Sequence, residues 1–85
     1  NSQRKDMEPV ILTLPQGASA EERLPFEGEE FGYVLDGAVE IVTLKEKYRL
    51  KRGDAFSIDG QKQHTLVNVG KTEARVLWVT TPSNF

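Results

Sequence analysis

His64 is the only histidine in this chain, and it lies within the stretch GDAFSIDGQKQHTLVNVG, residues 53–70. An imidazole in such a stretch could ligate a metal, act as a catalytic base, or sit in the core with its ring nitrogens hydrogen-bonded. The chain has no cysteine, which excludes a thiolate metal site and a cysteine nucleophile. The role of His64 therefore depends on the side chains that the fold brings beside it.

The apolar pattern predicts an all-β fold. Short runs rich in β-branched and aromatic residues recur along the chain, and turn signals containing Gly, Pro or Asp separate them. These runs cover residues 10–14, 21–26, 30–36, 38–44, 47–50, 55–58, 63–69 and 74–80. No segment has a helical period, and no internal repeat occurs. Many short strands at such spacing are typical of a β-sandwich or a β-barrel.

Two local patterns predict details of the sheets. Asp36-Gly37 is expected to close a type I′ hairpin, because such a turn needs positive φ at both central residues. In KEKYRLKR, residues 45–52, the basic residues at the odd positions fall on one strand face. A solvated edge strand explains them better than a phosphate-binding stripe does. Gly53-Asp54 and the Asn68–Gly70 stretch are interpreted as turn residues only.

Composition indicates one soluble domain. The chain has 85 residues, of which 38% are hydrophobic and 28% charged, and no apolar run approaches the ~18 residues of a membrane span. Its net charge is −2 with acids and bases interspersed, so this chain by itself offers no basic surface for nucleic acid. Residues 1–9 are polar and without apolar period, and we expect a linker or tail there and a single domain over residues 10–85.

Three segments carry a resemblance to a known family: GEEFGYVLDGAVEI, YRLKRGDAFSIDGQKQHTLVN and ARVLWVTTPSNF. They resemble the cupin superfamily, most closely the cupin domains that follow a helix-turn-helix (XRE-type) domain in bacterial transcription regulators. Glu30 and Gly37 match the end of the first cupin motif. Gly53, His64 and Asn68 match the second, while Asp59 replaces its proline. The ending VTTPSNF is similar to that of the regulator-linked branch.

The resemblance implies a small cupin barrel, a jelly-roll-like double-stranded β-helix of two antiparallel sheets with a pocket between them. Metal-binding cupins use an HxH pair together with the Glu and the His, but Leu24 and Phe26 occupy the HxH positions here. Glu30 and His64 alone are fewer than the three protein ligands usual at a catalytic metal. We therefore expect no metal and no cofactor. Asp59, Gln61 or Gln63 completing such a site remains the alternative.

Besides metal or general-base catalysis, two interpretations of the Glu30–His64 pair remain open. In one, the pair supplies the polar contacts of an otherwise apolar ligand pocket lined by Leu24, Phe26 and Phe56. In the other, His64 is a buried remnant whose ring nitrogens are satisfied by Glu30, a carbonyl or water. An ionised Glu30 nearby would favour the protonated imidazole and make the polarity of the pocket sensitive to pH.

Taken together, these features predict the small-molecule-sensing domain of a cytoplasmic transcription regulator. DNA would be bound only through an N-terminal helix-turn-helix domain outside this chain, and no membrane contact is expected. The alternatives are a free-standing metal-dependent cupin enzyme, such as an isomerase or a dioxygenase, and a barrel with a purely structural or protein-binding role.

Two predictions concern aromatic residues of the strands. Phe31, Tyr33 and Leu35 share a strand face opposite to that of Glu30, and this face either packs in the core or forms a homodimer interface. Trp78 is interpreted as a core anchor rather than as a ring that stacks on a ligand.

Overall fold

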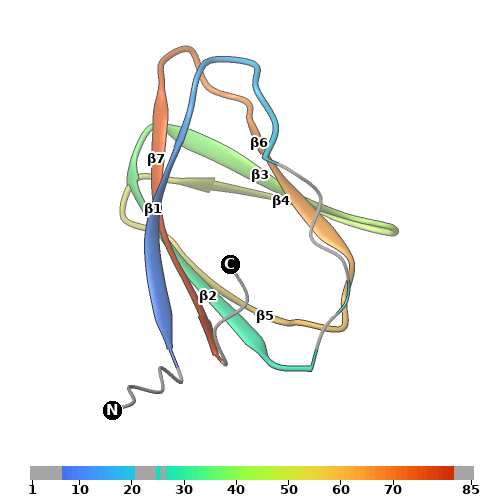
Figure 1. The fold of residues 1–85 in the computed structure, drawn as a ribbon. Coiled ribbons are helices and arrows are strands. Elements are labelled where there is room, and N and C mark those ends of the chain that lie inside the picture. Colours follow the sequence, from blue (N-terminus) through green and yellow to red (C-terminus); the bar gives the residue numbers. More distant parts are fainter. Residues whose placement is uncertain (1–6, 21–24, 26, 82–85) are drawn as a thin grey trace.

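The computed structural model describes residues 7–20, 25 and 27–81, which form two antiparallel sheets facing each other (Figure 1). One sheet has the order β1-β7-β2-β5, with β1 at Glu8–Leu14, β7 at Ala74–Thr81, β2 at Glu29–Asp36 and β5 at Ala55–Asp59. The other has the order β4-β3-β6, with β4 at Lys47–Lys51, β3 at Ala38–Thr43 and β6 at His64–Asn68. The prediction of an all-β barrel with two antiparallel sheets is confirmed.

Seven of the expected strands are present with small shifts at their ends, and the run at 21–26 lies mostly outside the described residues. β1 begins at Glu8, so the first sheet takes in two residues of the expected 1–9 linker. Pro9 is tolerated there because β1 is an edge strand that pairs only with β7 in the first sheet. No helix occurs within the ranges that the structure describes, and hence none long and apolar enough to cross a membrane.

The core lies between the inner faces of the two sheets. Strand residues alternate between buried and exposed, as in β6 and β7, because successive side chains point to opposite faces of a sheet. The buried apolar side chains are Leu14, Val34, Val39, Ile41, Leu66, Ala74, Val76 and Trp78. They come from both sheets, so this core is what holds the two sheets together.

The hairpin predicted at Asp36-Gly37 is wrong. β2 pairs with β5 and β7, whereas β3 pairs with β4 and β6, so Gly37 carries the chain from one sheet to the other. Gly37 has φ of 81°, and no described residue other than glycine has positive φ. A type I′ turn would require positive φ at Asp36 too. Glycine is needed here because the backbone of Gly37 passes close to that of Glu73 and Ala74. A Cβ at this position would lie 2.9 Å from both Ala74 Cα and Glu73 O.

The basic segment forms an edge strand, as predicted. β4 is an edge of the second sheet, and its odd-numbered residues Lys47, Arg49 and Lys51 are exposed. Tyr48 and Leu50 point to the other face, because they pair with Ile41 and Val39, which are buried. The strand therefore has a charged outer face and an apolar inner face, and the charges protect the edge from pairing with other chains.

Phe31 and Tyr33 lie on the outer face of the first sheet, so the core-packing interpretation of this strand face is wrong. Their exposed fractions are 43% and 39%, whereas Leu35 is half-buried beside an irregularity in the pairing of β2 with β7. Leu77 and Val79 pair with Tyr33 and Phe31 and extend the same apolar face. Further side chains of this face come from β1, which places Pro9 and Ile11 opposite Val79 and Leu77.

We expect Gly37→Ala to destabilise the fold by about 1–3 kcal/mol more than Gly17→Ala, because overpacking against backbone atoms adds to the cost of positive φ. Gly17 is the matched control, since its φ of 79° is similar and a Cβ there would meet nothing within 4 Å. Urea unfolding midpoints measure both losses. Equal losses would contradict the close approach of Gly37 to the Glu73–Ala74 backbone.

Candidate functional site

Glu30 and His64 meet in the interior, as the sequence predicted. Glu30 lies on β2 in the first sheet and His64 begins β6 in the second. His64 Nε2 is 3.1 Å from Glu30 Oε1, and the exposed fractions of the two side chains are 1% and 0%. A buried carboxylate needs partners to offset its desolvation. The contact therefore joins the two sheets through a buried polar pair.

Trp78 supplies a second partner to the same oxygen. Its indole Nε1 donates to Glu30 Oε1 at 2.6 Å, and its ring centroid lies 6.1 Å from that of His64. The burial predicted for Trp78 is confirmed at 2% exposure, but its hydrogen bond was not predicted. The bond depends on strand register, because Trp78 pairs with Gly32, two residues along β2 from Glu30. The sequence holds no signal that links positions 48 residues apart.

Gly32 provides the space in which the aromatic side chains lie. It pairs with Phe56 on one side and with Trp78 on the other. A Cβ at this position would overlap the Phe56 ring, so the absence of a side chain allows the ring to lie across β2. Phe56 then packs edge-on against Trp78, with ring centroids 6.4 Å apart and planes at 80°.

The hydrogen bonds of His64 define where its protons lie. Nδ1 is 2.7 Å from Lys62 O, and because a carbonyl only accepts, Nδ1 donates. The contact between Nε2 and Glu30 Oε1 then requires one proton between the two atoms. Either an imidazolium donates to a carboxylate, or a carboxylic acid donates to a neutral imidazole. Both ring nitrogens are thus engaged, which leaves neither free to accept a proton from a substrate without rearrangement.

The donors that the described residues bring to Glu30 and His64 do not fit a catalytic metal. Within the described ranges, no three His, Asp or Glu side chains gather closely enough to hold an ion. Ligation through His64 Nε2 would require the hydrogen bond to Glu30 to be given up. Asp59 is exposed and accepts from Gln61 N at 2.9 Å, as a turn residue does. Leu24 and Phe26, the two positions expected to line the pocket in place of the HxH pair, lie outside the described residues.

A cleft opens between the two sheets where β4 and β5 face each other, and we call it the inter-sheet cleft. It has a volume of about 340 Å³, within the usual size of small-molecule sites, and is lined by Ile41, Tyr48, Leu50, Phe56, Ser57, Ile58 and Lys62. Phe56 lines it as the sequence predicted. Because Phe56 packs on Trp78 and Trp78 donates to Glu30, two aromatic rings connect the cleft to the buried pair.

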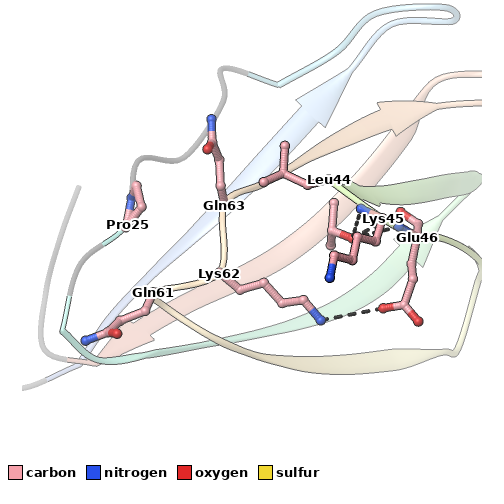
Figure 2. A pocket seen from close by; sticks show the side chains of 8 residues that line it. Pro25, Leu44, Lys45, Glu46, Gln61, Lys62 and Gln63 are labelled. Carbon is pink, nitrogen blue, oxygen red and sulfur yellow. Dashed lines mark hydrogen bonds and ion pairs between the residues drawn. The ribbon is translucent and has the colours of Figure 1, made fainter.

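A second hollow lies beside the first, and we call it the hairpin pocket (Figure 2). It measures about 460 Å³ and is lined by Pro25, Thr43, Leu44, Lys45, Glu46, Gln61, Lys62 and Gln63. Figure 2 shows Lys62 extending to the Glu46 carboxylate on the β3–β4 hairpin, with Nζ 3.6 Å from Oε1. Lys62 lines both hollows, which sequence reasoning missed because an isolated lysine in a turn resembles any solvated charge.

Tyr48 completes a polar cluster with Glu46 and Lys62. Interaction with the Tyr48 hydroxyl is the main cause that lowers the pKa of the Glu46 carboxyl; desolvation opposes it, and the charge of Lys62 lowers the pKa further. The same interaction raises the pKa of the Tyr48 phenol. Lys62, which lines the inter-sheet cleft, thus already pairs with one carboxylate.

Asn68 confirms its predicted turn role and does more. Its side-chain oxygen accepts from Gly70 N at 2.9 Å, which fixes the turn. Its Nδ2 donates to Thr72 O and to Leu14 O, at 2.9 and 3.0 Å. The bond to Leu14 ties the end of β1 to the opposite sheet, a long-range contact that turn chemistry alone does not indicate. Asp54 also acts as predicted, because its Oδ2 accepts from Lys51 N at 2.9 Å.

This barrel of two sheets, with its buried Glu and His, is the arrangement of a known domain family. The cupin domain model matches residues 10–80, and the chain therefore belongs to the cupin domain family. Over 76 residues it is 29% identical to the HTH-type transcriptional regulator PuuR of Escherichia coli K12. That match covers 89% of this chain and 41% of the relative, so the chain spans less than half of the relative's length.

Solved structures show the same fold. The cupin domain of Cnp3 from Schizosaccharomyces pombe matches with a TM-score of 0.84 and 16% identity, over 98% of this chain and 57% of that chain. A predicted oxalate decarboxylase from Thermotoga maritima matches with a TM-score of 0.80 and 24% identity, over 88% of this chain and 65% of that chain. One fold thus carries proteins with differently described roles, and the role here must be argued from the site.

We expect His64→Ala and Glu30→Ala each to cost about 3–5 kcal/mol, because each leaves a buried polar group without its partner. Their effects should be non-additive by about 0.5–3 kcal/mol in a double-mutant cycle read by urea unfolding. Glu30→Gln and His64→Asn replace them in the cycle if a variant fails to fold.

The control cycle uses Asp36→Ala and Arg75→Ala. Their ion pair has a similar distance of 3.0 Å, but the two side chains are 51% and 48% exposed. Its coupling should stay within about 0.2–1 kcal/mol, as is usual for exposed pairs. Equal coupling in the two cycles would contradict a special role for the buried pair.

Proposed function

We propose that this cupin domain is the small-molecule-sensing part of a transcription regulator. The observation that carries the proposal is the similarity to PuuR, a protein named as an HTH-type transcriptional regulator. The match covers nearly all of this chain but a minor part of the relative, as expected if the DNA-binding part lies in another domain. DNA would then be bound by an N-terminal helix-turn-helix domain, and the protein would work in the cytoplasm.

In this proposal the effector binds in the inter-sheet cleft against Phe56, and the buried Glu30–His64 pair behind this wall responds to its binding. The cleft supports it because its wall is apolar and drawn from both sheets, so that an occupant would bridge them. The pair lies behind Phe56 and Trp78. A ligand in the cleft would therefore act on the pair indirectly, through its contact with Phe56 and the packing of Phe56 on Trp78. Leu24 and Phe26 remain proposed lining residues on the basis of the sequence.

The runner-up is a metal-dependent cupin enzyme. The likeness to a predicted oxalate decarboxylase is one of fold, at 24% identity. The side chains favour the sensor, since His64 uses both ring nitrogens in hydrogen bonds and its carboxylate neighbour is held by Trp78. An isomerase or dioxygenase mechanism would need donors that the described residues do not bring to Glu30 and His64.

The sensor proposal predicts that the full-length protein binds DNA from its own promoter region and that a small molecule changes this affinity. The small-molecule fraction of a cell extract should shift the DNA-binding curve, and mass spectrometry of the bound fraction should identify the effector. Phe56→Ala should abolish the response because it removes a wall of the cleft. Leu44→Ala, at a side chain that is 84% exposed outside the cleft, should respond as the wild type does.

Metal content distinguishes the sensor from the metal-dependent enzyme. Elemental analysis finding near one Zn, Fe, Mn or Ni per wild-type chain after mild purification would overturn the sensor proposal. We expect substoichiometric metal in the wild type. The variant carrying Leu24→His and Phe26→His should gain metal affinity, because it restores the HxH pair of metal-binding cupins.

We further propose a homodimer formed by the outer face of the first sheet. Phe31 and Tyr33 are large and partly exposed there, next to Ile11, which is 54% exposed. A contiguous apolar face of this kind is an aggregation liability unless it is covered. In a dimer, β2 would carry Glu30 on its inner face and the subunit contact on its outer face, so that a ligand could alter subunit placement.

Sedimentation should therefore show a dimer for the wild type at tens of micromolar, and Phe31→Lys with Tyr33→Lys should shift it to monomer. Burying a charge at an apolar contact is unfavourable unless it is paired. Leu44→Lys serves as control, because it adds the same charge at an exposed apolar residue outside this face. A wild-type chain that remains monomeric, or a Leu44→Lys variant that dissociates equally, would count against this interface.

A further inference from the structure

We infer that the effector class of the inter-sheet cleft is a small carboxylate with an apolar body, whose carboxylate is bound at the rim by Lys62 and Tyr48. The inference deepens the proposed function and rests on it for the role of the cleft. Its basis is the distribution of charge around the cleft, taken together with the carboxylate that Lys62 already pairs with.

The walls of the cleft select an apolar body. Ile41 and Leu50 come from the second sheet, while Phe56 and Ile58 come from the first. These side chains are buried or half-buried, so an occupant would meet hydrocarbon on both sides. Burial of apolar area would contribute roughly 25 cal/mol per Å² toward binding before the cost of association is deducted.

The rim has one sign of charge. Of the residues that line the inter-sheet cleft, Lys62 alone carries a formal charge, and Tyr48 adds a phenolic hydroxyl. The basic residues of β4 do not add to this charge. Lys47, Arg49 and Lys51 alternate with Tyr48 and Leu50, so they lie on the face of β4 that points away from the cleft. A charged ligand group that enters the cleft thus meets a cation and a hydroxyl donor, which suits an anion.

Glu46 shows what this rim binds. Its carboxylate lies 3.6 Å from Lys62 Nζ, but it belongs to the β3–β4 hairpin and lines the hairpin pocket rather than the cleft. The Lys62 and Glu46 side chains are 50% and 51% exposed, so this ion pair is weak and can be exchanged. Glu46 therefore acts as an internal competitor that a ligand carboxylate would displace from Lys62.

Lys62 also connects the rim to the buried pair. Its side chain reaches the cleft, while its backbone carbonyl accepts the hydrogen bond from His64 Nδ1. A ligand that draws the Lys62 side chain away from Glu46 therefore acts on the same residue whose carbonyl orients the His64 imidazole. Binding at the rim can thus bias the Glu30–His64 contact without direct contact between ligand and pair.

The test uses three probes with one apolar chain and different head groups: octanoate, 1-octanol and octylammonium. Calorimetry gives their affinities. The fluorescence of Trp78, the only tryptophan of the chain, reports occupancy of the cleft, because Phe56 lines the cleft and packs on the Trp78 ring. We expect octanoate to bind the wild type about five- to tenfold more tightly than octanol, the size of one partly exposed charge-assisted contact.

Three variants locate the charge. Lys62→Gln should reduce octanoate affinity to that of octanol, and Glu46→Gln should raise it several-fold by removing the internal competitor. Lys45→Gln is the matched control, because it removes the same charge from the hairpin pocket but not from the cleft. It should leave the preference for octanoate unchanged.

Equal binding of octanoate and octanol, tighter binding of octylammonium, absence of binding by all three probes, or an unchanged Lys62→Gln variant would each overturn the inference. These failures are distinct from failure of the sensor proposal. A protein that selects octanoate through Lys62 but whose DNA affinity ignores every small molecule keeps the carboxylate site and loses the sensor role. A protein whose DNA affinity responds to a cationic effector does the reverse.

Discussion

Glu30 Oε1 is the acceptor on which the interior of this domain depends. It accepts from the Trp78 indole and shares a proton with His64, so one atom links two strands of the first sheet to the first residue of β6 in the second. A carboxylate buried in a small core costs several kcal/mol unless its lone pairs are used. Two surrounding features supply these partners. The register of β2 with β7 places Trp78 beside Glu30, and the Lys62 carbonyl orients the His64 ring toward it.

The two sheets approach each other closely where the chain crosses at Gly37 and are open where the inter-sheet cleft lies. Gly37 takes the chain across from β2 to β3 through a space that no side chain could share, and the tight approach to Ala74 closes that end. β4 and β5 are each an edge strand of their sheet, no strand of the described residues lies between them, and the inter-sheet cleft forms there. The strands thus place apolar walls and a polar rim at one accessible position.

The same barrel occurs in proteins described as a regulator, a cupin domain of Cnp3 and a predicted oxalate decarboxylase. The fold therefore sets where a ligand can bind, and the side chains set the chemistry. Here the histidine is committed to hydrogen bonds at both nitrogens and the carboxylate to an indole. In the proposed function, such a pair would respond to a ligand in the neighbouring cleft rather than act as a base on a bound substrate.

The sequence by itself determined the strand content and the Glu30–His64 pairing, because period-two alternation, turn residues and motif spacing are local or family-level signals. It also placed the charged edge at β4. The tertiary structure decided what depends on register and on sheet partners. Asp36-Gly37 resembles a hairpin turn, but sheet pairing made it a crossing. Phe31 and Tyr33 resemble core residues, yet the face they share lies outside the sandwich. The roles of Trp78 and Lys62 likewise follow from contacts between residues distant in sequence or from cleft geometry, which no local pattern encodes.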